Sequence, residues 1–101
     1  MTVKLVVLYT QPEDPAAFDQ HYLDVHMPLV DAIPGLQRAE TAKFVTALDG
    51  GEQTYYRSAE LYFADDAAMQ AAFGSPEGGA TAKDYGDIAP PGSRMFVAAV
   101  D

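Results

Sequence analysis

The sequence predicts a single α+β domain in which two units of strand, helix and strand share one antiparallel sheet. Three observations lead to this fold class. The 101 residues are enough for one hydrophobic core and too few for two. Their apolar periodicity follows the order strand, helix, strand, strand, helix, strand, which is the βαββαβ order of a ferredoxin-like domain. Right-handed crossovers then place both helices on one face of a four-stranded sheet, and residues 1–101 form one domain.

The first predicted strand spans residues 3–9, which are rich in Val and Leu and apolar on both faces except at Lys4. A strand of this kind is buried on both sides and lies at the centre of its sheet. The predicted helices cover only one face, so we expect a second copy of the chain to cover the other through a two-fold axis. The sequence therefore predicts a homodimer.

A helix is predicted next, after a polar turn in which Asp14 can cap it and Pro15 can take its first position. Its core-facing stripe recurs at spacings of three and four and comprises Phe18, Tyr22, Val25, Leu29 and Ile33. At about 100° per residue, His26 lies about 40° from the middle of this stripe. His21 lies about 100° from it, near the solvent boundary.

Two prolines interrupt this helix. Pro28 has no N–H to donate to the carbonyl of Asp24, so we expect the helix to kink or loosen within a turn of His26. Pro34 and Gly35 then end it.

A hairpin is predicted from residues 36–46 and 54–63, joined by a turn at Asp49-Gly50-Gly51. In its second strand, alternation places four polar or aromatic side chains on one face, namely Tyr56, Ser58, Glu60 and Tyr62. The sequence leaves open which face of this strand meets the helices.

The last part of the chain is predicted to form two helices and a strand. Asp65 and Asp66 suit the start of a helix because acidic side chains favour its exposed amides. The three elements cover residues 67–73, a segment from a Ser75 cap to Ile88, and residues 94–100.

Composition narrows the range of partners and compartments. A net charge of −9 and only six Lys and Arg residues argue against nucleic acid and anionic membrane surfaces as partners. The chain has no cysteine, which excludes disulfides and thiolate metal sites. Its first residues lack the basic region and cleavage site of an export signal, so we expect a cytoplasmic protein.

The helix with the two histidines also carries a family resemblance. The residues involved are Phe18, His21-Tyr22, His26, Pro28-Leu29 and Pro34-Gly35-Leu36. Their order resembles the signature of the EthD family, small proteins of the dimeric α/β-barrel superfamily. The resemblance implies that two four-stranded sheets pack face to face into a barrel, which agrees with the argument from residues 3–9. The family is named for an accessory protein of ether degradation and resembles cofactor-independent cyclases, methylisomerases and monooxygenases.

His26 is the candidate catalytic residue, because a histidine can act as general acid or base near neutral pH. The resemblance supports this role, while the alternative is a core histidine with a hydrogen-bonded ring. The candidate substrate-binding residues are Tyr22, Glu60, Tyr62 and His21. For Tyr22, plain core packing is as consistent with the sequence as substrate binding. Glu60 either assists His26 or pairs with a basic residue at the dimer interface. Histidines five apart lie on different faces of an α-helix, so no metal site is expected.

Two classes of function fit these residues. In the first, the protein is an enzyme without a cofactor that transfers protons on a small hydrophobic carbonyl- or hydroxyl-bearing metabolite, as isomerases, cyclases and oxygenases do. In the second, it binds such a metabolite as an accessory protein without catalysis. Haem binding through one histidine is a weaker alternative, which visible absorbance would test.

Overall fold

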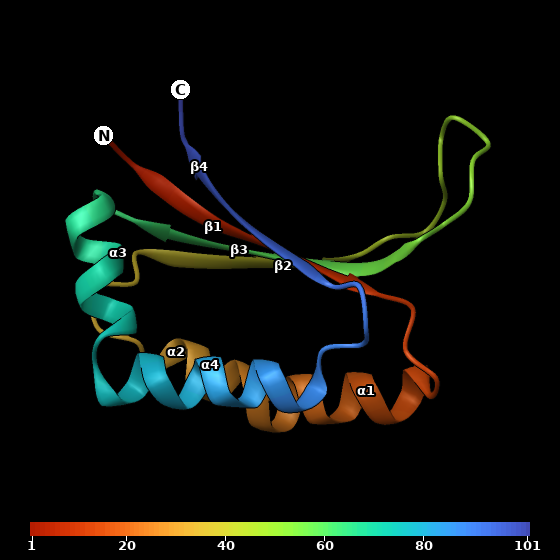
Figure 1. The fold of residues 1–101 in the computed structure, drawn as a ribbon, viewed down its shortest axis with the longest axis horizontal. Helices are drawn as coiled ribbons and strands as arrows, with labels where there is room; N and C mark the ends of the chain where they lie inside the picture. The colour runs from red at the N-terminus through yellow and green to blue at the C-terminus, as the bar shows by residue number, and fades with distance from the viewer.

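The computed structural model describes residues 1–101 as a four-stranded antiparallel sheet with all helices on one of its faces (Figure 1). The strands are β1 (Val3–Thr10), β2 (Arg38–Lys43), β3 (Tyr55–Phe63) and β4 (Arg94–Ala99). They lie in the order β2-β3-β1-β4. The helices are α1 (Pro15–His21), η1 (Tyr22–His26), α2 (Met27–Asp31), α3 (Asp66–Phe73) and α4 (Pro76–Ile88). The predicted ferredoxin-like α+β fold is confirmed.

β1 lies at the centre of the sheet, as its apolar pattern predicted. It pairs with β3 on one side and β4 on the other, and Val3 lies opposite both Phe63 and Ala99. Its alternate residues Val3, Val7 and Tyr9 are buried beneath the helices. The core therefore lies between the sheet and the helical layer.

The first helix departs from α-helical geometry where Pro28 led us to expect it. Its middle part, η1, is a π-helix, and the amide of Met27 donates to the carbonyl of Tyr22 across five residues. The buried stripe follows a spacing of mostly four residues and comprises Phe18, Tyr22, His26, Val30 and Ile33. The prediction that Val25 belongs to this stripe was wrong, because its side chain is 43% exposed. The wider π-helical turn rotates His26, instead of Val25, into the core.

An irregularity in β3 corrects a second prediction. The pairing between β1 and β3 shifts between Tyr9 and Thr10, where Thr10 lies opposite Tyr55. Such a bulge breaks the alternation of side chains. Tyr56 was expected to share the face of Glu60, but its hydroxyl donates to Oδ2 of Asp19 in α1 over 2.6 Å. It therefore belongs to the helical side.

Helices α3 and α4 start at the predicted caps. Asp65 accepts a hydrogen bond from the amide of Ala68, and Ser75 accepts one from the amide of Gly78. Gly78 is buried in the first turn of α4, against the end of α3. A Cβ at this position would overlap the carbonyl oxygen of Ala72 and lie 2.7 Å from Cα of Phe73. The close approach of the two helices therefore requires glycine here.

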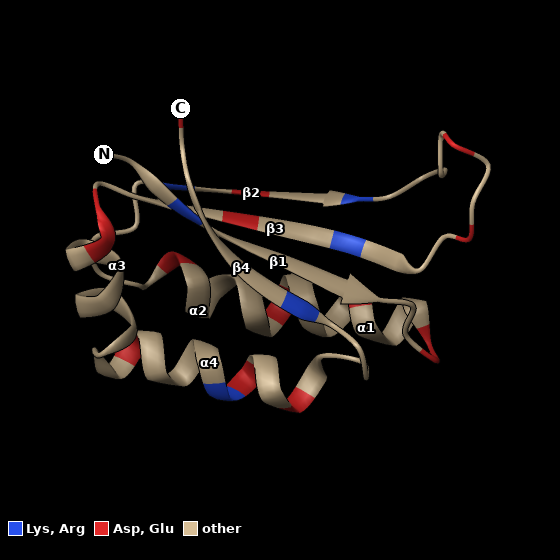
Figure 2. Ribbon diagram, turned by 45° about the horizontal axis from the view of Figure 1, so that its top comes forward, with Lys and Arg blue, Asp and Glu red and all other residues tan.

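Charge is distributed unevenly between the two layers, as Figure 2 shows. Five of the six basic residues lie on strands, namely Lys4, Arg38, Lys43, Arg57 and Arg94.

None of the helices has both the length and the apolar character needed to cross a membrane.

The contact between α3 and α4 generates a prediction about two neighbouring glycines. Gly78→Ala should lower the free energy of unfolding by about 3 kcal/mol or more, because the new methyl group meets backbone atoms that cannot move aside. Gly79 lies in the same helix with nothing within 4 Å of its Cβ position. Gly79→Ala should therefore raise stability by about 0.5–1 kcal/mol through helix propensity.

Urea unfolding of both variants beside the wild type measures these changes. Equal effects of the two substitutions would contradict the close packing of α3 against α4.

Candidate functional site

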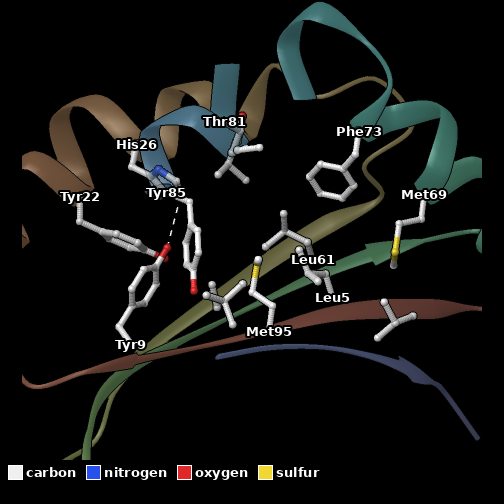
Figure 3. A pocket seen from close by; sticks show the side chains of 15 residues that line it. Leu5, Tyr9, Tyr22, His26, Leu61, Met69, Phe73, Thr81, Tyr85 and Met95 are labelled. Carbon is white, nitrogen blue, oxygen red and sulfur yellow. Dashed lines mark hydrogen bonds between the residues drawn. The ribbon is translucent and has the colours of Figure 1, made fainter. Parts of the chain in front are cut away.

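A cavity of about 350 Å³ lies between the sheet and the helices (Figure 3). Thirteen of its 15 lining residues are hydrophobic, and they come from β1, β3, β4 and the helices. Met95 and Val97 line the cavity and yet are 51% and 59% exposed, because β4 is an edge strand. The cavity therefore opens beside β4.

His26 lies at the polar end of this cavity, with its ring beside Tyr9 (Figure 3). Its Nδ1 is 2.8 Å from Oδ2 of Asp84, and its Nε2 is 3.5 Å from the hydroxyl of Tyr9. A carboxylate only accepts hydrogen bonds, so Nδ1 carries the proton and Nε2 has a free lone pair. The contact with Tyr9 is longer than a strong hydrogen bond, which leaves this lone pair available to a ligand.

Burial sets the protonation states of the His26 ring and the Tyr9 hydroxyl. It lowers the pKa of His26 below its usual value of 6.5, and the hydrogen bond with Asp84 opposes this shift only in part. Burial also raises the pKa of Tyr9 far above its usual value of 10.0. At neutral pH, His26 is therefore a neutral acceptor and Tyr9 a hydrogen-bond donor.

Asp84, from α4, also binds the second histidine. Nε2 of His21 lies 2.9 Å from its Oδ1 and 3.2 Å from its Oδ2. Burial alone would raise the pKa of Asp84, but its hydrogen bonds with His21 and His26 outweigh burial and lower it. The ionised carboxylate thus joins α4 to both ends of the π-helical turn.

Tyr22 supports His26 from the other side. The two rings stack at an angle of 24° with centroids 5.4 Å apart. The guanidinium of Arg57 lies 4.4 Å from the centre of the Tyr22 ring. The Tyr22 hydroxyl is buried without a partner, and burial raises its pKa to about 12. Tyr22 therefore both packs in the core and lines the cavity.

The candidate site residues fall into three groups in the structure. His26 and Tyr22 line the cavity. His21 contacts Asp84 behind His26 and does not line it. Glu60 and Tyr62 lie on the opposite face of the sheet, where Glu60 pairs with Lys4 at 3.2 Å and accepts a hydrogen bond from Tyr62. Our expectation that these two residues bind substrate is corrected, because their neighbours Ala59 and Leu61 occupy the face toward the cavity.

Sequence reasoning missed Asp84, Tyr9 and Tyr85, which complete the polar end of the site. Tyr9 ends the first predicted strand on its buried face, so its alternation with Val7 was a usable signal. Asp84 and Tyr85 follow Thr81 at spacings of three and four in α4, on its buried side. The glycines of this helix obscured the pattern.

A metal site is not formed by the cluster. The chain contains no group of three or more His, Cys, Asp or Glu side chains that could hold a metal ion. Both histidines instead donate to the one carboxylate.

The fold and the cavity define a small ferredoxin-like protein with a buried histidine at the end of an apolar pocket. The chain belongs to the EthD family, whose EthD domain model matches residues 10–89. An uncharacterised 11.0 kDa protein in the thcB-thcC intergenic region of Rhodococcus erythropolis is 41% identical over 93 residues, which cover 92% of this chain and 89% of that protein. The crystal structure of an EthD family protein from Bacillus halodurans is 37% identical, with full coverage of both chains and a TM-score of 0.93.

More distant structures share the fold alone. A hydroxynitrile lyase from Passiflora edulis has a TM-score of 0.81 at 12% identity, over 99% of this chain and 94% of its own. A variant of SnoaB, a cofactor-independent oxygenase from Streptomyces nogalater, has a TM-score of 0.67 at 17% identity, over 98% and 92%. Several further chains of this fold are described as dimeric ferredoxin-like proteins.

The lowered pKa of His26 generates a prediction about stability and pH. Below about pH 6.5 the unfolded chain takes up a proton at His26 that the folded chain does not. The free energy of unfolding should therefore fall as the pH drops from about 7 to about 5. Asp84 titrates below this window, because its pKa is lowered from 3.8.

Chemical unfolding at several pH values tests this, with His26→Asn as the variant and His21→Asn as its control. The slope between about pH 7 and 5 should flatten in His26→Asn. An unchanged slope there would show that His26 does not cause it.

Proposed function

We propose that this protein catalyses proton transfer, without a cofactor, on a small hydrophobic metabolite that carries a carbonyl or hydroxyl group. One observation carries the proposal. The free Nε2 of His26 faces an apolar cavity, is oriented by a carboxylate behind it and lies beside the hydroxyl of Tyr9. A histidine in this arrangement is suited to general acid–base catalysis.

The proposed chemical step uses His26 as the proton acceptor and Tyr9 as a hydrogen-bond donor. Nε2 of His26 accepts a proton from the carbon next to the substrate carbonyl, so a C–H bond breaks and an N–H bond forms. The electron pair moves to the carbonyl oxygen, and the Tyr9 hydroxyl donates a hydrogen bond to that oxygen. Asp84 stabilises the imidazolium that results. Return of the proton to another atom of the enolate completes an isomerisation. In a cyclisation, the enolate carbon instead bonds to a second carbonyl carbon of the same molecule, and the oxygen of that carbonyl takes up the proton. In an oxygenase reaction, O2 is the oxidant that accepts electrons from the enolate.

The shape and lining of the cavity support a particular class of substrate. Its polar groups lie at the end with His26, Tyr9 and Tyr85, whereas Met69 and Phe73 lie at the other end (Figure 3). Its volume of about 350 Å³ suits a small metabolite. We infer a ligand with one polar group and an apolar body, which enters beside β4.

Enzymes with this fold support a catalytic role, including the cofactor-independent oxygenase and the hydroxynitrile lyase. Binding without catalysis is the second candidate. It is favoured by the lining itself, in which 13 of 15 residues are hydrophobic. The two candidates differ in whether a bound compound exchanges protons with His26.

Deuterium exchange tests the proposal without knowledge of the natural substrate. Small apolar ketones, diketones and lactones are incubated with the protein in D2O, and deuterium next to the carbonyl is followed by mass spectrometry. His26→Asn should slow the exchange of a responsive compound by about two to four orders of magnitude, because it removes the proton acceptor. Tyr9→Phe should slow it less, because it removes only a hydrogen bond.

His21→Asn is the matched control, since it changes a histidine outside the cavity and should have a milder effect. Binding of a compound without exchange would favour the second candidate. Equal rates in the wild type and in folded His26→Asn would end the catalytic proposal.

We also propose that the protein is a homodimer joined through the open faces of two sheets. Val6 and Leu8 of β1 point to this face, and Phe96 lies opposite Val6 in β4 with 42% of its surface exposed. Pairing of two copies would cover these apolar side chains. The dimeric ferredoxin-like proteins with this fold are consistent with that arrangement.

Sedimentation at micromolar concentration tests this assembly. The wild type should sediment as a dimer, and Phe96→Glu should shift it toward monomer, because a carboxylate would be buried at the centre of the interface. A folded wild-type monomer would contradict the proposed dimer.

A further inference from the structure

Arg57 is a buried cation with an incomplete set of partners. Its side chain is only 7% exposed, and its charged partner is Asp19, whose Oδ1 lies 3.8 Å from Nε of the guanidinium. Nε and Nη1 are both buried without a hydrogen bond. A buried charge usually has such bonds, because one distant ion pair does not offset the loss of hydration. Part of the positive charge of Arg57 is therefore left uncompensated in the core.

The carboxylate of Asp19 is shared between two cations. Its Oδ2 accepts a hydrogen bond from Lys43 over 2.9 Å and another from Tyr56 over 2.6 Å. Lys43 lies opposite Arg57 in the register of β2 and β3, so two cations flank one carboxylate and one positive charge is in excess. The Lys43 side chain is 50% exposed, so water and salt screen its charge far more than that of Arg57.

This excess charge lies behind the polar end of the cavity. The guanidinium of Arg57 is 4.4 Å from the centre of the Tyr22 ring, and Arg57 lies opposite Tyr9 in the neighbouring strand. Both tyrosines line the cavity, whereas Arg57 does not. Burial raises the pKa of both tyrosine hydroxyls, and the positive charge of Arg57 opposes both rises. The charge of Arg57 therefore acts on the groups that face a ligand.

We propose that Arg57 makes the polar end of the cavity selective for a negatively charged oxygen, and so stabilises the enolate oxygen that forms when His26 takes a proton from the substrate. The second part of the inference rests on the proposed function. None of the 15 lining residues is Lys or Arg, so a positive charge that favours the oxyanion has to act from behind the lining. Arg57 does so across Tyr22 without touching the ligand, which makes it a positioning residue.

A purely structural role would use the chain of Arg57 and its packing on the Tyr22 ring, but not its charge. Arg57→Met keeps an unbranched apolar chain and removes the charge, while Asp19 keeps its hydrogen bonds to Lys43 and Tyr56. Lys43→Met is the matched control. It removes a charge from the same carboxylate, but a half-exposed one that lies over the ring of Tyr56.

The probes are para-nitrophenolate and para-nitroanisole, which differ in the charge and the methyl group on one oxygen. Dissociation constants of both are measured by absorbance at a pH where the free phenol is ionised. Arg57→Met should weaken binding of the phenolate by about tenfold, because it removes a poorly screened charge about one aromatic ring away. Binding of the ether should stay within about twofold. Lys43→Met should change the binding of either probe by less than about twofold.

Asp19→Asn should change the selectivity in the opposite direction. It removes the carboxylate that partly neutralises Arg57, so the phenolate should bind about threefold more tightly while binding of the ether stays unchanged. This variant also decides the question if Arg57→Met does not fold, since unchanged or weaker phenolate binding in Asp19→Asn would overturn the inference.

Three other results would overturn it as well. They are a wild type that binds no phenolate, equal weakening of both probes in Arg57→Met, and a loss in Lys43→Met as large as that in Arg57→Met. No proton transfer to His26 is measured, so failure of the charge selectivity leaves the proposed proton acceptor in place. If deuterium exchange on ketones fails while phenolate binding depends on Arg57, the cavity selects oxyanions without catalysing that exchange.

Discussion

One carboxylate holds the candidate site together. Asp84 accepts hydrogen bonds from two histidines, so a single side chain of α4 joins both ends of the π-helical turn. The carboxylate is mostly buried, and an ionised group in such a place requires partners that offset its desolvation. His21 and His26 are these partners, and each makes a charge-assisted hydrogen bond to the carboxylate. Because Asp84 occupies Nδ1 of His26, Nε2 is left to face the cavity, and the chemistry of the pocket depends on this choice of tautomer.

The π-helical turn is what allows both histidines to meet one partner. Residues five apart point in different directions on an α-helix, which is why the pair His21 and His26 looked unrelated in the sequence. In a π-helix the hydrogen bonds join residues five apart, so those residues lie one above the other. The amide of Met27 makes such a bond to Tyr22. Pro28, which follows directly, cannot donate the next α-helical bond and so favours the wider turn over a regular helix.

Local patterns were enough to predict the fold, but they could not assemble the site. Strand alternation and helix caps depend on neighbouring residues, so element order and most boundaries could be predicted from the chain alone. His26 became a candidate through its place on the helix together with the family resemblance. The prediction for Val25 was wrong because the spacing of apolar residues does not reveal a π-helical turn. Asp84 and Tyr9 come from segments far from His26 in the chain, and only tertiary packing brings them together. The face that carries Glu60 could not be predicted, because alternation defines two faces without saying which one the helices cover.

The side chains at the polar end of the cavity are held by more polar contacts than those at the apolar end. At the polar end, His26 is held from α4 by Asp84 and from β3 through Tyr22, whose ring lies beside the buried cation of Arg57. Asp19 lies 3.8 Å from Nε of that cation and receives a hydrogen bond from Tyr56, so α1 is joined to the sheet at the same place. No comparable polar contacts surround the apolar end, which opens along an edge strand. Under the proposed function, changes in ligand shape would be accommodated there without moving the histidine. The residues that select a substrate would then be separate from those that act on it.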